Sequence, residues 1–304
     1  MKHILVTGPH RSGTTWIGNT IASHGGMRLL LEPFNSNFPP YGFGVHLTHP
    51  YTHFESSEQQ EELRRAFDCV LAEGPGGYAR GVCQATNAGW KTPLRFAWHY
   101  LQAVKSPRVL VKDPIALFSA DWLHEQYDLA VICTMRSPWA FVASLKVAKW
   151  GFSFKNLAKQ EELMAEFPSE MVTKMHHLIE NSDDKIEKWS HLWNLLHHQI
   201  LSYKERFPSW HFIRYEEVAA EPQKGFAGIL NHLNLEMTPA VSKYIDDYTS
   251  TKNKTETNST SYQPRDSKKI LESWRERLTE SEIAQVTEAT ADLASKLYPD
   301  IQVS

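Results

Sequence analysis

Metal-binding and disulfide motifs are scarce in this sequence. Its three cysteines, Cys69, Cys83 and Cys133, are odd in number, and none forms a Cys-x-x-Cys pair. Structural zinc sites and small disulfide-dependent domains need such pairs or an even set of cysteines. The histidine pairs at 176–177 and 197–198 lack the spacing of metal ligands and are predicted to lie on helix surfaces. We therefore expect no metal, and we expect Cys133 to lie in the core.

Long hydrophobic runs and an excess of basic charge are lacking as well. No segment approaches the roughly 18 apolar residues that span a bilayer, and Gly8 interrupts the short apolar start MKHILVTG, which argues against a signal peptide. Acidic side chains number 35 and basic ones 32, whereas nucleic-acid-binding proteins usually carry a basic excess. We expect a cytoplasmic monomer or homodimer with no membrane and no nucleic-acid partner.

Hydrophobic residues make up 41% of the chain, enough to bury a sizeable core. Short apolar runs alternate with helical patterns, which indicates a mainly parallel sheet flanked by helices. The predicted strands are residues 3–7, 28–31, 108–111, 129–134 and 210–214. The predicted helices are residues 14–23, 58–72, 116–126, 140–150, 184–206, 222–234, 238–247 and 267–297.

These elements predict one α/β domain over residues 1–304, with a P-loop-like three-layer fold. Residues 151–183 are mixed and partly helical, and we expect them to form a cap over the site. Residues 249–266 are rich in Ser, Thr, Asn and Lys, which is typical of a mobile loop. Ligands of parallel sheets bind at the carboxyl ends of the strands, where the residues described next all fall.

The turn after the first strand is Gly8-Pro-His-Arg-Ser-Gly-Thr-Thr-Trp16. Gly8, Gly13 and Thr15 match the phosphate-binding pattern GxxxxGK[ST], in which backbone N–H groups and a helix N-terminus face an anion. Thr14 replaces the lysine of that pattern, so an ATP or GTP enzyme would lose its main γ-phosphate contact. Arg11 supplies the positive charge from within the turn instead. That arrangement suits a smaller group that carries only a 5′-phosphate and a sulfate.

The run Arg-Ser-Gly-Thr-Thr-Trp after a strand resembles the 5′-phosphosulfate loop of sulfotransferases that use 3′-phosphoadenosine 5′-phosphosulfate (PAPS), of the bacterial and carbohydrate types. The resemblance implies that Arg11 reaches the bridging oxygen of the donor and that Trp16 stacks on its adenine. It also implies that four residues of the turn hold the 5′-phosphate: Ser12, Gly13, Thr14 and Thr15.

A second basic position follows the strand at 129–134. Arg136 precedes Pro138 and a helix, and Ser144 lies eight residues further on. An arginine at a strand end is a good bidentate partner for phosphate, and in the family an Arg and a Ser at this spacing bind the 3′-phosphate. The resemblance further implies that Tyr215 contacts the adenine, or else packs in the core. It also implies a basic loop that closes over the 3′-phosphate, with Arg265 and Ser267 as candidates.

Sulfuryl transfer needs a base for the acceptor proton and a positive group for the charge that grows on the bridging oxygen. Glu32 ends the second strand, and its context Leu-Leu-Glu-Pro-Phe resembles the Phe-Glu-Pro segment of related enzymes. We expect the fold to bring Glu32 next to the first turn as the base. The alternatives are an ion pair with a lysine or arginine, or a base among His46, His49 and His53. Lys112, in a Lys-Asp-Pro segment, is expected to bind the sulfate or to orient the acceptor.

The acceptor itself is not specified by the sequence. Aromatic residues in the segment 35–54 suggest a lined cleft that suits a small molecule or a carbohydrate, and the nucleophile is a hydroxyl or an amine. Two other functions compete with PAPS-dependent transfer. One is a nucleotide kinase of the same architecture, against which Thr14 argues. The other is a non-catalytic nucleotide-binding protein, against which Glu32 and Lys112 argue.

Overall fold

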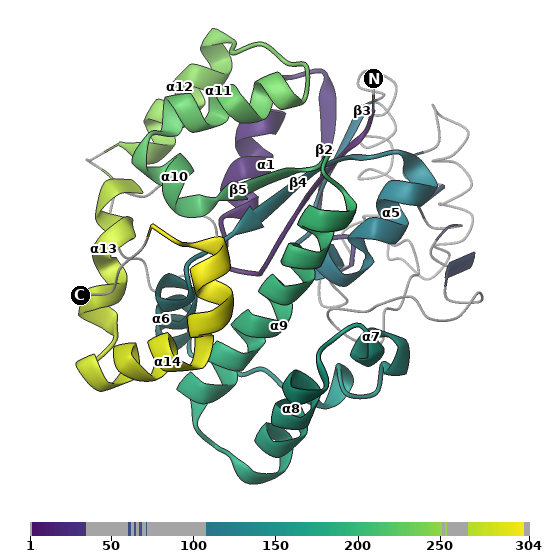
Figure 1. Ribbon diagram of the computed structural model, residues 1–304. Coiled ribbons are helices and arrows are strands. Elements are labelled where there is room, and N and C mark those ends of the chain that lie inside the picture. Colours follow the sequence, from purple (N-terminus) through teal and green to yellow (C-terminus); the bar gives the residue numbers. More distant parts are fainter. Residues whose placement is uncertain are drawn as a thin grey trace, which may run out of the picture.

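The computed structural model describes residues 2–34, 60, 61, 64, 67, 68, 71, 108–250, 253 and 267–300. Their strands form one parallel sheet in the order β2-β3-β1-β4-β5 (Figure 1). The strands are β1 (Ile4–Thr7), β2 (Met27–Leu31), β3 (Arg108–Lys112), β4 (Ala130–Met135) and β5 (His211–Arg214). The predicted parallel α/β fold is confirmed, and each predicted strand lies within about two residues of the observed one.

Alternate side chains of the strands enter two separate cores, one on each face of the sheet. Ile4 and Val6 of β1 point to one face, and Leu5 points to the other. The first face is covered by α1 (Thr14–Ala22), α10 (Tyr215–Ala220), α11 (Pro222–His232) and α12 (Pro239–Thr249). The second is covered by η1 (Ile115–Ser119), α5 (Ala120–Tyr127), α6 (Pro138–Ala148) and α9 (Lys185–Arg206). The flanking helices thus give the three layers that the sequence predicts.

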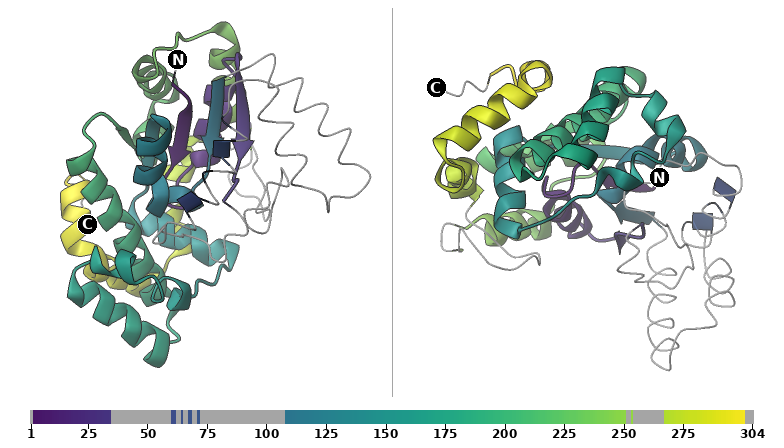
Figure 2. Two further views of the ribbon diagram at one scale, coloured as in Figure 1. Left: turned by 90° about the vertical axis from the view of Figure 1, so that its right-hand side faces the viewer. Right: turned by 90° about the horizontal axis from the view of Figure 1, so that it is seen from below.

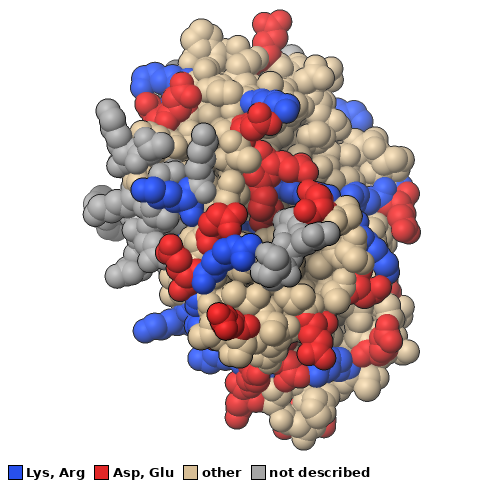
Figure 3. All heavy atoms as spheres, turned by 60° about the vertical axis from the view of Figure 1, so that its left-hand side comes forward, with Lys and Arg blue, Asp and Glu red and all other residues tan. Residues whose placement is uncertain are grey.

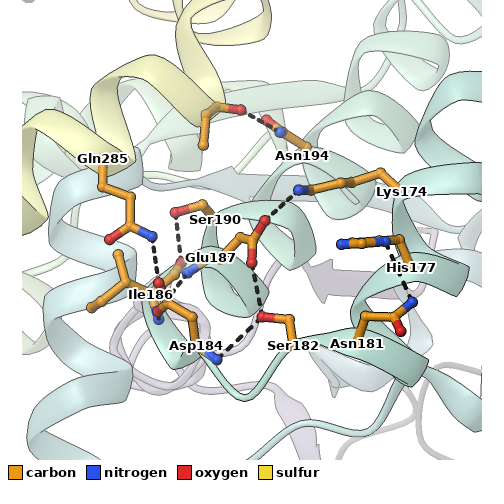
Figure 4. A network of polar contacts seen from close by, with 11 residues as sticks. Lys174, His177, Asn181, Ser182, Asp184, Ile186, Glu187, Ser190, Asn194 and Gln285 are labelled. Atoms are coloured by element: carbon orange, nitrogen blue, oxygen red, sulfur yellow. Dashed lines mark hydrogen bonds and ion pairs between the residues drawn. The ribbon is translucent and has the colours of Figure 1, made fainter.

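The segment 151–183 contains the short η2 (Phe154–Asn156), α7 (Glu161–Ala165) and α8 (Ser169–Asn181), which pack on α9. The corner between α8 and α9 is held by polar contacts (Figure 4). Asp184 caps α9 by accepting a hydrogen bond from the N–H of Ile186 at 2.8 Å. Glu187 accepts one from Ser182 Oγ at 2.8 Å and forms an ion pair with Lys174. The helical content matches the prediction, while the role of a cap stays a prediction.

The C-terminal region departs from the single helix predicted over 267–297. It forms α13 (Ser267–Arg277) and α14 (Glu280–Leu297), because Thr279 starts a new helix with a capping box. Its hydroxyl accepts from the N–H of Glu282, and the Glu282 carboxylate accepts from the N–H of Thr279. α14 lies beside α6 and α9 (Figures 1 and 2). Gln285 of α14 donates a hydrogen bond to Asp184 at 2.6 Å (Figure 4), which links the first turns of α14 to the start of α9.

Two further predictions differ in detail. The helix predicted over 116–126 is a 3₁₀ turn, η1, followed by α5, and residues 215–220 form a helix where none was predicted. The aromatic segment 35–54, Cys69 and Cys83 lie outside the described residues, as does nearly all of the loop predicted over 249–266. Cys133 is buried, as expected.

The helices of the described ranges include none that is both long and apolar enough to cross a membrane. On the face shown in Figure 3, acidic and basic side chains are interspersed over the described surface.

Candidate functional site

The turn between β1 and α1 depends on three residues with positive φ, Gly8 at 136°, Arg11 at 65° and Gly13 at 86°. Gly8 also passes close to β4. A Cβ there would lie 2.3 Å from Thr134 Oγ1 and 2.4 Å from the Thr134 carbonyl oxygen. The missing side chain therefore lets the turn wrap back over the end of β4. Because β1 and β4 are neighbouring strands, the turn that follows β1 lies beside the residues that follow β4.

Ser12 fastens this turn to the sheet. It is buried, and its hydroxyl bonds to the carbonyl oxygen of Pro9 and lies 2.5 Å from Thr134 Oγ1. Thr134 in turn donates to the carbonyl oxygen of Thr7 at 3.2 Å. The Ser12 hydroxyl is therefore engaged within the turn, which leaves the backbone as the part of Ser12 best placed to face a ligand.

The start of α1 carries positive partial charge, and its own first turn holds no acidic side chain to offset it. Gly13 is its N-cap, no side chain caps the helix, and its first turn contains no acidic residue. Thr15 is partly exposed at this end, and Thr14 is buried. Backbone N–H groups at an uncapped helix start bind anions well.

Arg136 and Ser144, the second predicted pair, both contact Arg11 of the first turn. Arg136 Nη1 donates to the Arg11 carbonyl oxygen. Arg11 Nε donates to Ser144 Oγ at 2.8 Å. Arg136 is only 9% exposed, so its charge lies in a poorly hydrated place beside the Gly8–Trp16 turn. Two basic side chains and one hydroxyl, from the residue after β4, from the first turn and from α6, thus meet at one end of the sheet.

Tyr215 lies under this cluster at the start of α10. The Arg136 guanidinium carbon is 4.9 Å from the centre of the Tyr215 ring. A Cβ on Gly13 would lie 2.4 Å from Tyr215 Cδ2, so the glycine lets the turn rest on the ring. Tyr215 is buried and acts as the floor of the cluster.

Trp16 is more enclosed than a stacking platform for adenine requires. It is 2% exposed, and the Tyr248 ring is stacked on it, with centroids 5.3 Å apart and planes at 19°. Tyr215 and Phe226 meet it edge-on. An adenine ring would reach the stacked face of Trp16 only where Tyr248 now lies.

Glu32 follows β2, and β3 lies between this strand and β1, which the first turn follows. Glu32 Oε1 is 2.5 Å from Lys112 Nζ, and the two side chains are 29% and 3% exposed. The ion pair that the sequence analysis kept as an alternative is thus present. Lys112 runs beneath α1, where a Cβ on Gly18 would lie 2.9 Å from its Cγ.

Asp113, which the sequence analysis gave no role, holds the chain after Glu32 in place. Its carboxylate accepts from the N–H of Phe34 at 2.6 Å and from the N–H of Ile115 at 2.9 Å. Burial raises the pKa of Asp113 to about 7, and the charge of Glu32 adds to this while the two N–H donors oppose it. The Lys-Asp-Pro segment was the feature of the sequence that could have pointed to Asp113.

Two buried histidines support the cluster. His10 packs between Phe141 and Trp150, and burial lowers its pKa to about 3. His197, predicted to lie on a helix surface, is fully buried, which corrects that prediction. Its Nδ1 is 2.9 Å from the Trp193 carbonyl oxygen, and its Nε2 accepts from the N–H of Arg136 at 3.4 Å. Burial lowers the pKa of His197 to about 3 as well.

The remaining candidates are Ser267 and several residues outside the described part of the chain. Ser267 is buried as the first residue of α13. Arg265, His46, His49 and His53 lie outside the described residues. Within the described ranges, no three or more His, Cys, Asp or Glu side chains are grouped as metal ligands are.

Comparison with known proteins gives one family. The model of the sulfotransferase family matches residues 3–239. A search of curated proteins finds no match. Among solved structures, the sulfotransferase domain from the Synechococcus PCC 7002 olefin synthase is 16% identical with a TM-score of 0.49, over 99% of this chain and 98% of that one. The sulfotransferase domain from the curacin biosynthetic pathway is 15% identical with a TM-score of 0.47, over 96% and 98%.

Proposed function

Because the chain belongs to the sulfotransferase family, we propose that it transfers the sulfuryl group of PAPS to a hydroxyl or amine of a small-molecule or carbohydrate acceptor. The observation that carries this proposal is the meeting of Arg136, Arg11 and Ser144. PAPS has one anionic group on each side of its ribose, a 5′-phosphosulfate and a 3′-phosphate. Two basic groups that meet at the ends of neighbouring strands suit such a molecule.

The residues of the turn fit the 5′ end of the donor. The start of α1 offers uncapped N–H groups and no acidic side chain, which favours a phosphate there. Arg11 is the basic group of this turn, and its bond to Ser144 fixes the direction of its guanidinium. Arg11 would stabilise the charge that grows on the bridging oxygen as the bond from that oxygen to sulfur breaks.

The 3′-phosphate would bind Arg136 and Ser144. Arg136 is held by Tyr215 beneath it and by the N–H contact to His197 behind it. Such pre-organisation lowers the entropy lost when a ligand binds. Of the residues assigned to the donor, Trp16 fits least directly, because Tyr248 must move before adenine can take the stacked position.

Glu32 is the proposed base. The acceptor loses its proton to this carboxylate as its oxygen or nitrogen forms the new bond to sulfur. Lys112 holds the carboxylate at 2.5 Å, and Asp113 fixes the backbone that follows it. Glu32 lies two strands from β1, so the acceptor would lie between the β2 edge and the first turn.

The competing proposal of a nucleotide kinase is disfavoured by Thr14. A kinase of this architecture uses a lysine at that position for the γ-phosphate. The charge here comes from Arg11, whose side chain points toward Ser144 of α6.

Calorimetry tests the donor assignment. We expect adenosine 3′,5′-bisphosphate to bind at least about tenfold more tightly than ATP, a difference of about 1.4 kcal/mol. Equal affinities would favour the kinase. A screen of hydroxyl and amine acceptors with sulfur-labelled PAPS then tests the transfer itself. A chain that binds the bisphosphate but sulfates no acceptor would favour the non-catalytic alternative.

A further inference from the structure

Glu216, the second residue of α10, is a carboxyl group that the proposed donor site does not use. Its Oε1 accepts a hydrogen bond at 3.0 Å from the N–H of Ser137, the residue after Arg136. The residue as a whole is partly exposed, but its Oε2 is closed off from solvent and has no hydrogen-bond partner in the described part of the chain. A buried carboxylate oxygen without a donor is costly unless a positive charge compensates it or a proton binds it.

Arg136 supplies that positive charge. Burial raises the pKa of Glu216, while the charge of Arg136 and the N–H of Ser137 oppose the shift. The state of this carboxyl group therefore depends on how strongly Arg136 is neutralised by something else. A bound phosphate would neutralise Arg136 and add negative charge beside Glu216.

Among the described residues, Tyr298, Arg214 and Glu217 are the other ionisable groups around Glu216, and they are neutral or already paired. Tyr298, at the end of α14, is buried, and its hydroxyl has no hydrogen-bond partner among the described residues. The charge of Glu216 helps to raise the pKa of Tyr298, after burial itself, so this phenol stays neutral. Arg214 of β5 pairs with Asp300 at 2.7 Å and with Glu217 at 3.5 Å.

The basic residues of the helices that pack on α10 are paired or exposed to solvent, so they contribute little charge beside Glu216. Lys224 of α11 pairs with Glu221 at 2.9 Å on the exposed surface. Lys269 of α13 is exposed to solvent. Of the described charged groups, Arg136 is therefore the one that couples Glu216 to the ligand.

We propose that Glu216 is the counter-charge of Arg136 in the ligand-free protein and takes up a proton from solvent when a phosphate binds Arg136. Glu216 also positions the turn through the N–H of Ser137. This inference rests on the proposed function, because it takes the Arg136 pocket as the site of the 3′-phosphate. Two negative groups beside one arginine repel each other, and protonation of the buried carboxylate removes that repulsion.

Calorimetry in buffers of different ionisation enthalpy, from about pH 5 to about pH 8.5, measures the protons taken up with the ligand. With adenosine 3′,5′-bisphosphate, we expect the wild type to take up more protons than Glu216→Gln, with a difference that approaches one at its maximum. The proton exchange of the ligand itself cancels in this difference. In the same pH range, the affinity of both proteins for the bisphosphate is compared. Each unit of rising pH should lower the affinity of the wild type by up to about tenfold more than it lowers the affinity of the variant.

Glu217→Gln is the matched control, since its side chain is 64% exposed and neighbours Glu216 in sequence. It should match the wild type. AMP, which lacks the 3′-phosphate, should give the same proton count in all three proteins. Glutamine has nearly the shape of glutamate and retains an oxygen for the N–H of Ser137, so the turn should persist.

Equal proton uptake by the wild type and Glu216→Gln would overturn the inference. If Glu216→Gln does not fold, infrared difference spectra of the wild type decide instead. A new protonated-carboxyl band on binding the bisphosphate, absent with AMP, would support the inference, and its absence would overturn it. If the wild type binds no bisphosphate, the proposed function is overturned. This outcome differs from equal proton uptake with intact binding, which overturns only the role of Glu216.

Discussion

At the scale of single residues, the site is a set of charges held by hydrogen bonds to the backbone and to a hydroxyl. Arg136 reaches the carbonyl oxygen of Arg11, and Arg11 reaches Ser144, so the basic groups are ordered before any ligand arrives. The pair of Glu32 and Lys112 is different, because a buried lysine depends on its carboxylate. Glu32 thus stabilises the fold through this ion pair and, in the proposed function, also accepts a proton.

The two roles of Glu32 make separate predictions. Glu32→Gln should lower turnover about 100-fold, the usual contribution of a general base. It should also lower the free energy of unfolding by about 3 kcal/mol, because Lys112 loses its carboxylate. The affinity for adenosine 3′,5′-bisphosphate should stay within about twofold, since no step of donor binding uses Glu32. Kinetics, urea unfolding and calorimetry measure these three quantities.

Asp121→Asn is a suitable control for this prediction. Asp121 pairs with Arg206 at 3.0 Å, and its side chain is 11% exposed. This variant should lose stability while keeping turnover. If Glu32→Gln behaved in the same way, its ion pair would be purely structural and the base would be another group.

At the scale of elements, the first turn works because it fits tightly against β4. Gly8→Ala should destabilise the protein by about 3 kcal/mol or more, because its Cβ would meet the backbone of Thr134 as well as its side chain. Gly25→Ala is the matched control, since Gly25 also has positive φ, 83°, but a Cβ there meets nothing within 4 Å. It should cost only about 1 kcal/mol of backbone strain. Equal losses in urea unfolding would mean that the close approach to β4 is unimportant.

α9 supports the site through His197, which predicts a pH dependence. A histidine whose pKa is lowered to about 3 binds fewer protons in the folded state than in the unfolded one. Stability therefore decreases as pH falls from about 6.5 toward 3, by up to about 1.4 kcal/mol per pH unit for this group. His197→Gln should make this decrease shallower in urea unfolding between about pH 6 and pH 4.

His176→Gln, at an exposed position of α8, is the control for the loss of a histidine as such. An unchanged slope in His197→Gln would show that His197 titrates in the folded protein as it does in the unfolded chain. Its support of the Arg136 backbone would then be absent.

At the scale of the whole molecule, the parallel sheet followed from local signals in the sequence. Val109, Val131 and Ile132 lie in apolar runs that suit strands buried on both faces, and these strands were predicted to within about two residues. The order of the strands was not predictable in this way. β3 enters between β1 and β2 through contacts far apart in sequence, so no local signal indicated that Lys112 would lie next to Glu32.

The candidate site was predicted in part. Arg136 and Ser144 meet the first turn as the motif spacing suggested, because both follow the strand next to β1. The Ser12–Thr134 contact and the buried His197 depend on packing between elements, for which single residues give no signal. The break before α14 was not predicted, although the sequence carries a signal for it, since Thr279 and Glu282 have the spacing of a capping box.

The central claim is that Arg136 and the first turn form two connected anion pockets for one nucleotide. Calorimetry of Arg136→Ala with adenosine 3′,5′-bisphosphate and with AMP tests it most directly, with Arg206→Ala, an arginine 43% exposed, as the control. We predict that Arg136→Ala weakens the bisphosphate about 100-fold and AMP no more than about threefold, while the control changes neither. Equal losses for the two nucleotides, or no loss for either, would contradict the account.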